Sequence, residues 1–361
     1  MTGDLLKILI LAGNFNNTGG TERVGSLVAN GLSEAGYEIV LASMSCGDKP
    51  FFPLNKEIKV TSLFNSPGRT LYRAPSLIYK IRKLLKEEKI DILIVVETMS
   101  VLFTLPAVIG LPVKHICWEH FNFKSDLGKK GRRIARQLAA RYCDSVVTLT
   151  ERDKEYWLAG TQHKNQITAI PNPCPFPVQD NAYPKHSKII LAVGRLVNIK
   201  GYDFLLQAWL KVIKYAPDWQ LKIVGEGEER ASLSQFITDN NLADSVELVG
   251  NTDNVQKYYE QAAIFCLSSR FEGFPMVLLE TLSFGLPVVS FDCDTGPAEI
   301  LDGTGSILVK PYDTDLLADG LNTLIADVDL RESISIASKE KAKQYQSDEI
   351  IQYWTALLKS I

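Results

Sequence analysis

The sequence predicts an α/β protein built from two doubly wound parallel-sheet domains. Short β-branched runs alternate with amphipathic helical segments along the chain, which is typical of a parallel sheet covered by helices. The segment PNPCPFPVQDNAYP, with five prolines in 14 residues, interrupts this alternation near the middle. A chain of 361 residues is also long enough for two cores. Because such sheets bind ligands at the carboxyl ends of their strands, we expect the two domains to face a central cleft.

In the first half, the strands follow the short aliphatic runs. We predict them at 5–11, 38–43, 91–96, 113–118, 145–149 and 167–170. The most apolar stretch, 92–118, contains Glu97, Pro106 and Pro112, so it is a poor membrane span. We interpret it as two strands joined by a short helix.

After the proline-rich segment the alternation begins again. We predict strands at 188–193, 219–224, 246–249, 264–267, 287–291 and 307–309, and helices at 202–215, 228–240 and 275–284. A last helix at 348–359 has an apolar side made of Tyr353, Trp354, Leu357 and Leu358. We therefore predict a first domain at 1–175 and a second at 176–345, with the C-terminal helix at about 346–361 packing on the first domain.

Charge is distributed unevenly between the halves. Residues 1–180 hold 23 Lys and Arg against 17 Asp and Glu, a net +6, and subtraction from the totals of 39 and 42 leaves 16 against 25, a net −9, for residues 181–361. The basic segment 124–141 would attract anionic lipid headgroups or a lipid-linked phosphate acceptor; the alternative is a solvated helix face. We predict no nucleic-acid partner.

The start of the chain indicates a cytoplasmic protein. Its short apolar run leads directly into a loop of glycine and asparagine, which favours a buried strand over a signal peptide. The six cysteines show no CxxC spacing, as expected for reduced thiols. We expect a cytoplasmic location, with the inner face of the cytoplasmic membrane as a site of peripheral contact.

The strongest local signal is the stretch SSRFEGFPMVLLETLSFGLPVV. A helix beginning at Pro275 places Glu272 in the preceding loop and Glu280 inside the helix, so the two carboxylates have different surroundings. The backbone amides from Gly273 to Met276, which include Phe274, lie at the positive helix end and suit phosphates. The alternative is a solvated Glu280 and a capping Glu272.

Two glycine-containing loops form the next signals. Gly194-Arg195 closes the first strand after the prolines, and Lys200 follows five residues later; an arginine fork and a lysine charge suit a diphosphate. The alternative is an ordinary surface Arg and Lys. Near the start of the chain, Gly19-Gly20 permits close backbone approach to a ligand, and Thr21 is expected to cap the following helix.

These motifs, in this order and spacing over nearly the whole chain, resemble the family 4 retaining glycosyltransferases of the GT-B fold. The fold implied is two Rossmann-like domains facing a central cleft. Bacterial members that build lipopolysaccharide, capsule, exopolysaccharide or lipid-linked oligosaccharide look closest, on FEGFPMVLLE followed by DTGPAEI. The implied enzyme is a hexosyltransferase that uses a UDP-sugar as donor and a glycan or glycolipid as acceptor.

The resemblance also implies roles for individual residues. Arg195 and Lys200 would stabilise the departing diphosphate, and Glu272 would contact hydroxyls of the transferred sugar. Glu280 would bind the ribose hydroxyls. The remaining implied contacts are His120 at the acceptor, Gly20 with Gly19 and Gly194 at the phosphates, the backbone of Gly273, Phe274, Pro275 and Met276 near the sugar, and the backbone of Val249, Gly250 and Asn251 with Glu226 at the uracil.

We expect no metal or other cofactor, because Arg195 and Lys200 supply positive charge. Asp292-Cys293-Asp294 is a DxD sequence of the kind that holds a divalent metal against UDP in another glycosyltransferase fold. Here we expect this loop to contact the sugar or to cap the helix at Pro297. The competing functions are a nucleotide-sugar-binding protein without transferase activity, an epimerase of the same fold, and an NAD-dependent dehydrogenase. The sequence lacks the glycine fingerprint that such a dehydrogenase uses to bind NAD.

Overall fold

The computed structural model describes residues 6–68, 70–126 and 128–361; Leu5 of the predicted first strand and Leu127 of the basic segment lie outside them. The chain forms two compact units. Unit 1 contains Met1–Pro175 and Ser347–Ile361, and unit 2 contains Phe176–Gln346. The proline-rich segment, which lacks helix and strand, carries the boundary between Pro175 and Phe176.

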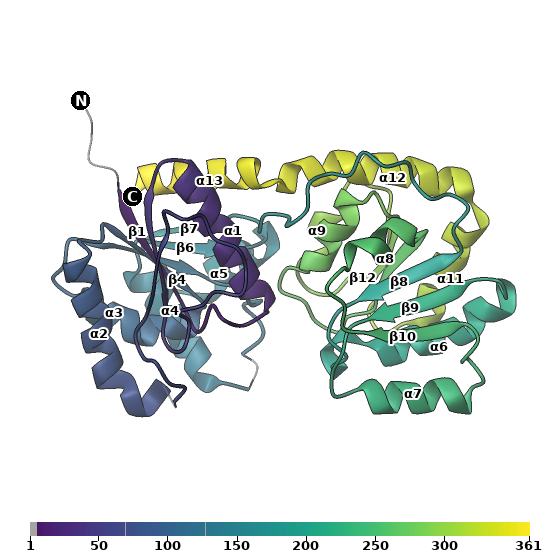
Figure 1. Ribbon diagram of the computed structural model, residues 1–361, viewed down its shortest axis with the longest axis horizontal. Helices are drawn as coiled ribbons and strands as arrows, with labels where there is room; N and C mark the ends of the chain where they lie inside the picture. Colours follow the sequence, from purple (N-terminus) through teal and green to yellow (C-terminus); the bar gives the residue numbers. More distant parts are fainter. Residues whose placement is uncertain (1–5, 69, 127) are drawn as a thin grey trace. The chain divides into compact units, whose positions relative to one another are not determined.

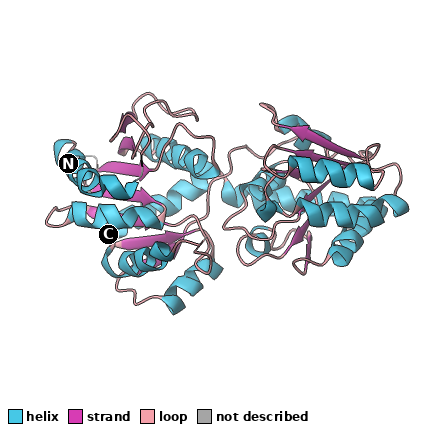
Figure 2. Cartoon of the chain, turned by 90° about the horizontal axis from the view of Figure 1, so that it is seen from below, coloured by secondary structure: helices cyan, strands magenta, loops and turns pink. Residues whose placement is uncertain are grey.

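Unit 1 is a seven-stranded parallel sheet in the order β3-β2-β1-β4-β5-β6-β7, with helices on both faces (Figures 1 and 2). Its strands are β1 (Lys7–Ala12), β2 (Glu38–Ser43), β3 (Lys59–Ser62), β4 (Ile92–Val96), β5 (Lys114–Trp118), β6 (Ser145–Thr148) and β7 (Gln166–Ala169). Its α-helices are α1 (Gly20–Glu34), α2 (Ala74–Glu87), α3 (Val101–Val108), α4 (Lys130–Tyr142), α5 (Glu151–Gly160) and α13 (Ser347–Ser360), and two short 3₁₀ turns are η1 (Thr70–Arg73) and η2 (Thr98–Ser100). The strand order reverses between β1 and β4.

Unit 2 is a six-stranded parallel sheet in the order β10-β9-β8-β11-β12-β13. Its strands are β8 (Ile189–Val193), β9 (Gln220–Val224), β10 (Val246–Gly250), β11 (Ile264–Leu267), β12 (Val288–Phe291) and β13 (Ile307–Val309). Its helices are α6 (Tyr202–Tyr215), α7 (Arg230–Asp239), α8 (Gln256–Gln261), α9 (Met276–Ser283), α10 (Pro297–Ile300), α11 (Thr314–Ala326) and α12 (Val328–Ala342), with 3₁₀ turns η3 (Asn198–Lys200) and η4 (Lys343–Tyr345). Here the order reverses between β8 and β11. The predicted class, two doubly wound parallel sheets, is confirmed.

The central strands are buried on both faces, as parallel sheets require. Residues 8–12 of β1 are at most 2% exposed, which explains the uninterrupted aliphatic run KILILA. In unit 2, Trp209 of α6 packs into a core shared with Ile190 of β8 and Phe291 of β12. These cores hold the carboxyl ends of the strands in fixed positions, where the loops that carry functional side chains begin.

The C-terminal helix α13 lies along α1 in unit 1 (Figure 1). Gly31 of α1 leaves room for Ile351, since a β-carbon at position 31 would lie 2.4 Å from the Ile351 side chain. The Trp354 ring meets the Trp118 ring with 4.9 Å between centroids. Trp354 is buried, but Tyr353 is 55% exposed, so the prediction that Tyr353 belongs to the apolar side was wrong. Its neighbour Trp354 occupies that side of the helix.

Three further local predictions are corrected. The strand β3 was not predicted, because KVTS lacks an aliphatic run and its side chains are only partly buried. Helix α9 begins at Met276, with Pro275 as the residue before its first turn. Helix α1 begins at Gly20 with Gly19 as its N-cap and no side-chain cap, so Thr21 lies inside the first turn.

Among the described residues, every helix is too short or too polar to cross a lipid bilayer. This agrees with the interpretation of 92–118 as β4, α3 and β5 rather than a membrane span.

Candidate active site

The loops after β8, β9 and β10 are joined by close backbone contacts. The Gly225 amide donates to the Gly250 carbonyl (2.9 Å), and the Gly194 amide donates to the Val224 carbonyl (2.9 Å). Gly225 has a φ of 141°, and a β-carbon there would lie 2.0 Å from the Gly194 carbonyl oxygen. Only glycine fits at position 225 without moving the loop that carries Gly194 and Arg195.

Lys200 and Glu272 form an ion pair at the point where the strand order of unit 2 reverses. The Lys200 Nζ donates to Glu272 Oε1 at 2.7 Å, and the Ser269 hydroxyl donates to the same oxygen at 2.6 Å. Lys200 follows β8 and Glu272 follows β11, the two strands that flank the reversal. Glu272 Oε2 accepts no hydrogen bond from the described residues, so this oxygen is available to a ligand.

The Arg195 side chain is exposed and has no ionic partner among the described residues. The backbone around it is fixed, because the Leu196 amide donates to the Glu226 carbonyl at 2.8 Å. The methylene groups of Lys200 lie close to Gly194, whose β-carbon would be 3.6 Å from Lys200 Cε. Gly194, Arg195, Lys200 and Glu272 are therefore neighbours, with one cation paired and the other open to an anionic ligand.

Glu280 is buried inside unit 2. It is 4% exposed, and Glu280 Oε2 accepts a hydrogen bond from the Tyr259 hydroxyl at 2.7 Å. The alternative of a solvated Glu280 is therefore wrong. The alternative of Glu272 as a helix cap is also wrong, since α9 has no side-chain cap.

The loop before α9 is held from a second direction. The Thr295 hydroxyl lies 3.0 Å from the carbonyls of both Glu272 and Gly273 and donates to them. Phe274 is 8% exposed and its ring faces Tyr345. These contacts fix the segment Gly273 to Met276 at the amino end of α9, where a helix favours negative charge.

Glu226, Val249, Gly250 and Asn251 lie together at the ends of β9 and β10. Glu226 Oε1 accepts from the Arg230 guanidinium at 2.7 Å, and a β-carbon at Gly250 would lie 3.1 Å from that oxygen. Gly250 has a φ of 89° and Asn251 is exposed. The structure thus places Gly194, Glu226 and Gly250 at the carboxyl ends of three neighbouring strands of one sheet, β8, β9 and β10.

The Asp292-Cys293-Asp294 loop directly follows β12 and leads to Thr295. The expectation that this loop caps the helix at Pro297 is wrong, since the N-cap residue of α10 is Gly296 and no side chain caps the helix. In the described part of the chain, no three His, Cys, Asp or Glu side chains are grouped as metal ligands.

In unit 1, α1 begins at Gly20 with Gly19 as its N-cap, after the loop that follows β1, and His120 follows β5. The His120 ring rests against Trp118 with 4.6 Å between centroids. Burial lowers the pKa of His120 to about 3, and among the described residues its Nε2 has no hydrogen-bond partner. His120 is therefore a neutral imidazole at physiological pH, with one ring nitrogen left without a partner.

Sequence reasoning missed Glu119, the residue before His120. Its carboxylate accepts hydrogen bonds from the amides of His120 and Phe121 (both 3.1 Å), from the Thr98 hydroxyl (2.6 Å) and from Arg136 Nε (3.2 Å). Glu119 is 1% exposed. The signal was an acidic residue at the end of an apolar strand, at the edge where such sheets bind ligands.

Glu97, at the end of β4, was also missed as a site residue. It has a φ of 73°, a strained conformation for a residue with a side chain. Its Oε1 accepts from Arg132 Nη2 at 2.7 Å. Burial raises the pKa of Glu97, while the charge of Arg132 opposes that rise.

The basic segment 124–141 is not a uniformly solvated face. Arg132 is 1% exposed and Arg136 is 2% exposed, and both point into unit 1 toward Glu119. Lys129, Lys130 and Arg141 remain exposed. The expectation that the whole segment meets an anionic surface therefore needs correction, because two of its arginines are buried in ion pairs with Glu97 and Glu119.

Lys200, Glu272 and Arg195 thus lie where the strand order of unit 2 reverses, and comparison with known proteins identifies the class of the chain. Residues 18–175 match Glycosyltransferase Family 4, and residues 187–327 match Glycosyl transferases group 1. An uncharacterized glycosyltransferase of Haemophilus influenzae is 36% identical over 98% of this chain and 99% of its own length. The chain belongs to glycosyltransferase family 4.

Two further relatives span the chain. The amylovoran biosynthesis glycosyltransferase AmsD of Erwinia amylovora is 29% identical over 98% of this chain and 100% of its own length. The GalNAc-α-(1→4)-GalNAc-α-(1→3)-diNAcBac-PP-undecaprenol α-1,4-N-acetyl-D-galactosaminyltransferase of Campylobacter jejuni is 28% identical over 99% of both chains.

Solved structures share the fold. The lipopolysaccharide outer core galactosyltransferase WaaB has a TM-score of 0.80 at 22% identity, covering 99% of this chain and 100% of that chain. HepE from Anabaena, in complex with UDP, has a TM-score of 0.82 at 19% identity, with the same coverage. The predicted family and fold are confirmed.

Proposed function

We propose that this glycosyltransferase is a retaining enzyme that transfers a hexose or an N-acetylhexosamine from a UDP-sugar to a glycan or lipid-linked acceptor in cell-surface polysaccharide biosynthesis. The observation that carries the proposal is the arrangement of Lys200, Glu272 and Arg195 around the strand reversal of unit 2. The proposal assigns the donor to unit 2 and the acceptor to unit 1.

The chemistry follows from charge. As the bond between the anomeric carbon and the diphosphate breaks, negative charge grows on the phosphate, and Lys200 and the open Arg195 guanidinium are suited to stabilise it. In our proposal the available Oε2 of Glu272 accepts a hydrogen bond from a sugar hydroxyl, while Lys200 holds Oε1. No metal is assigned a role, and no residue is assigned as a covalent nucleophile.

Other assignments concern recognition. Glu280 would accept hydrogen bonds from the ribose hydroxyls, and the backbone of Val249, Gly250 and Asn251, beside Glu226, would meet the uracil. Gly194 and the amides near Gly273 would approach the phosphates and sugar. In unit 1, Gly19 and Gly20 would face the phosphates, and the neutral His120 would hydrogen-bond the acceptor or the transferred sugar.

The relatives support the pathway and the acceptor class. The Erwinia relative is named for amylovoran biosynthesis, the Campylobacter relative for an undecaprenol-linked acceptor, and the Anabaena structure contains UDP. We therefore place this protein on the cytoplasmic side of the membrane, with the membrane surface as a peripheral partner.

Lys200→Ala tests the proposal. We expect kcat/KM to fall by about 10²–10³, the usual cost of removing one donor that stabilises developing negative charge. The matched control is Lys222→Ala, because both lysine side chains are 20% exposed in unit 2 and each is in an ion pair, Lys222 with Glu247. Transfer from UDP-, GDP- and ADP-sugars is measured, with NMR of the product to establish its anomeric configuration.

Equal activity of the two lysine variants, both folded by circular dichroism, would refute the assigned role of Lys200. An inverted product would refute retention, and preference for a GDP- or ADP-sugar would refute the donor class. Product formation without any acceptor would favour an epimerase instead.

A further inference from the structure

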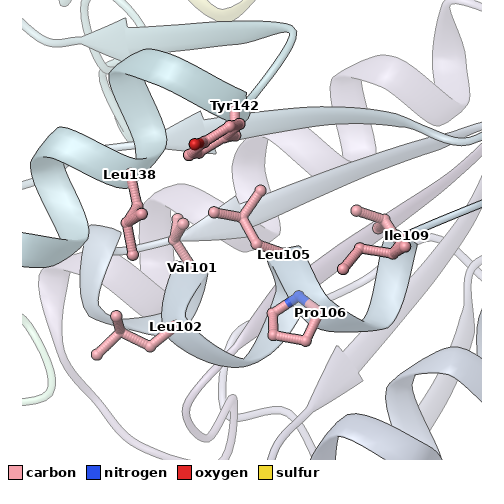
Figure 3. Close-up of a pocket in the computed structure, with 8 residues that line it drawn as sticks. Val101, Leu102, Leu105, Pro106, Ile109, Leu138 and Tyr142 are labelled. Atoms are coloured by element: carbon pink, nitrogen blue, oxygen red, sulfur yellow. The ribbon is translucent and has the colours of Figure 1, made fainter. Parts of the chain in front are cut away.

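An apolar groove lies between α3 and α4 in unit 1, and the proposed chemistry does not use it. Its volume is about 510 Å³, within the range of pockets that bind small molecules. Figure 3 shows Leu138 and Tyr142 of α4 on one side and Val101, Leu102, Leu105, Pro106 and Ile109 on the other. Apart from the Tyr142 hydroxyl, the labelled side chains are hydrocarbon. Such a lining is suited to a hydrocarbon ligand.

Local structure keeps the α3 side of the groove exposed. Pro106 lies inside α3 and has no amide proton, so it donates no helical hydrogen bond to the Leu102 carbonyl. The Arg82 guanidinium then donates to the carbonyls of Ala107 (2.9 Å) and Ile109 (2.6 Å), which supplies the partners that the end of a helix lacks. The backbone of Ile109 is fixed in this way while its side chain remains 71% exposed.

The α4 side combines apolar and basic side chains. Lys130, Ile134, Leu138 and Tyr142 recur every four residues, so they form one ridge along the helix. Ile134 is 60% exposed and Tyr142 is 57% exposed. The exposed Arg141 lies beside this ridge, with its guanidinium 5.8 Å from the Tyr142 ring centroid.

The two helices that form the groove carry positive charges and no negative ones. Helix α3 has no charged residue and α4 has no acidic residue. The two carboxylates that flank α4 in the sequence are paired with other cations, Asp126 with Arg133 and Asp144 with Lys114. Lys130 and Arg141 therefore have no anionic partner within the described part of the chain.

We propose that the α3–α4 groove binds a hydrocarbon chain of an anionic phospholipid in a bilayer, with Lys130 and Arg141 at the lipid phosphates. An exposed apolar patch bordered by cations matches the two layers of a bilayer surface, hydrocarbon below and anionic headgroups above. The inference rests on the proposed function only in placing the acceptor at a membrane. It identifies the α3–α4 groove as the surface that contacts the membrane. The buried arginines of the segment 124–141 take no part in this contact.

The test measures sedimentation of the full chain with vesicles, without any sugar donor. Wild-type protein is expected to bind vesicles of equal phosphatidylglycerol and phosphatidylcholine at least tenfold more tightly than pure phosphatidylcholine vesicles. Ile109→Asp should weaken binding at least tenfold. The matched control is Ile336→Asp in α12, where isoleucine is 72% exposed in unit 2; it should bind within twofold of wild type.

Charge reversal separates the two parts of the site. Arg141→Glu should weaken binding several-fold, while Lys214→Glu, an exposed lysine in the last turn of α6, should not. Tyr142→Asp provides a second groove variant if Ile109→Asp does not fold by circular dichroism.

The proposal is overturned if wild-type protein ignores phosphatidylglycerol vesicles, or if Ile109→Asp and Ile336→Asp bind them equally. It is also overturned if wild-type protein is a dimer that Ile109→Asp converts to a monomer without vesicle binding, because the groove would then join two copies. Lys200→Ala should bind vesicles normally, and Ile109→Asp should retain hydrolysis of a soluble UDP-sugar. Failure of the groove and failure of the proposed chemistry are thus distinguishable.

Discussion

Each unit has opposite charges at the carboxyl ends of its strands, but the two clusters differ in their access to water. In unit 1, the side chains of Glu119, Arg132 and Arg136 are 0–2% exposed, and Glu119 accepts four hydrogen bonds. In unit 2, the side chains of Lys200 and Glu272 are 20% and 10% exposed, and Glu272 keeps one oxygen available. The closed cluster is suited to hold loops in place, and the open one to exchange partners with a ligand.

The largest expected effect comes from breaking the closed cluster. Glu119→Gln removes the charge that balances buried Arg136. It also replaces one accepting carboxylate oxygen with an NH₂ group, which can only donate and so faces other donors. We expect the free energy of unfolding to fall by about 3–5 kcal/mol, because a buried cation is left uncompensated. Urea unfolding measures this loss.

The control for that variant is Glu38→Gln in the same unit, whose side chain is 57% exposed and paired with Lys7. An exposed ion pair contributes little, so the change should stay below about 1 kcal/mol. A Glu119→Gln protein as stable as the Glu38→Gln protein would show that burial does not distinguish the clusters.

Glu272→Gln should show the opposite pattern in the open cluster. Lys200 can regain hydration when its partner loses charge, so stability should change by about 1 kcal/mol or less. We expect kcat/KM for transfer to fall about 10²-fold, since both the sugar contact and the position of Lys200 are altered. Unfolding and kinetics are measured on the same preparation, and a stable variant with activity within threefold of wild type would contradict the role proposed for Glu272.

The smallest effect concerns Asp153, whose Oδ1 accepts from the Phe123 amide (2.7 Å) near the closed cluster. Burial raises its pKa to about 7, against the lowering effect of that hydrogen bond. The folded chain therefore binds this proton more tightly than the unfolded chain. The stability that Asp153 contributes is full below about pH 4 and is lost as the pH rises through about 7.

Asp153→Asn should remove that dependence, so the drop in unfolding free energy between pH 5 and pH 8 should shrink by about 2 kcal/mol. His115 and His120 act in the opposite direction, because burial lowers their pKa values to about 4 and about 3. Their contribution to the free energy of unfolding therefore increases as the pH rises from about 3 to 6.5. Subtracting the variant profile from the wild-type profile isolates Asp153. Parallel profiles would contradict this account.

The contrast between the clusters also separates what the sequence predicted from what it did not. Strands such as β1 and β11 were predictable because a parallel strand buried on both faces must be continuously apolar. Gly194-Arg195, Lys200 and the Glu272 segment were proposed as site residues because each follows a predicted strand of one sheet, and the structure pairs Lys200 with Glu272.

The closed cluster was not predicted, although part of its signal was visible. Arg132 and Arg136 are spaced i, i+4 and share a helix face with the buried Ala135 and Ala139, which marks them as inward-facing. Their partners Glu97 and Glu119 lie on two other segments. Only the pairing of β4 with β5 brings those carboxylates together. The spacing of apolar residues within one segment does not predict which strands pair.

The attachment of α13 to unit 1 has a consequence for the order of folding during translation. All of unit 2 is made before Ser347–Ile361, the segment that supplies Trp354 to the ring of Trp118 beneath His120. The nascent second unit is therefore able to complete its core while the older one still lacks a helix over α1. Until that segment leaves the ribosome, the Trp118 ring that packs against His120 lacks its contact with Trp354.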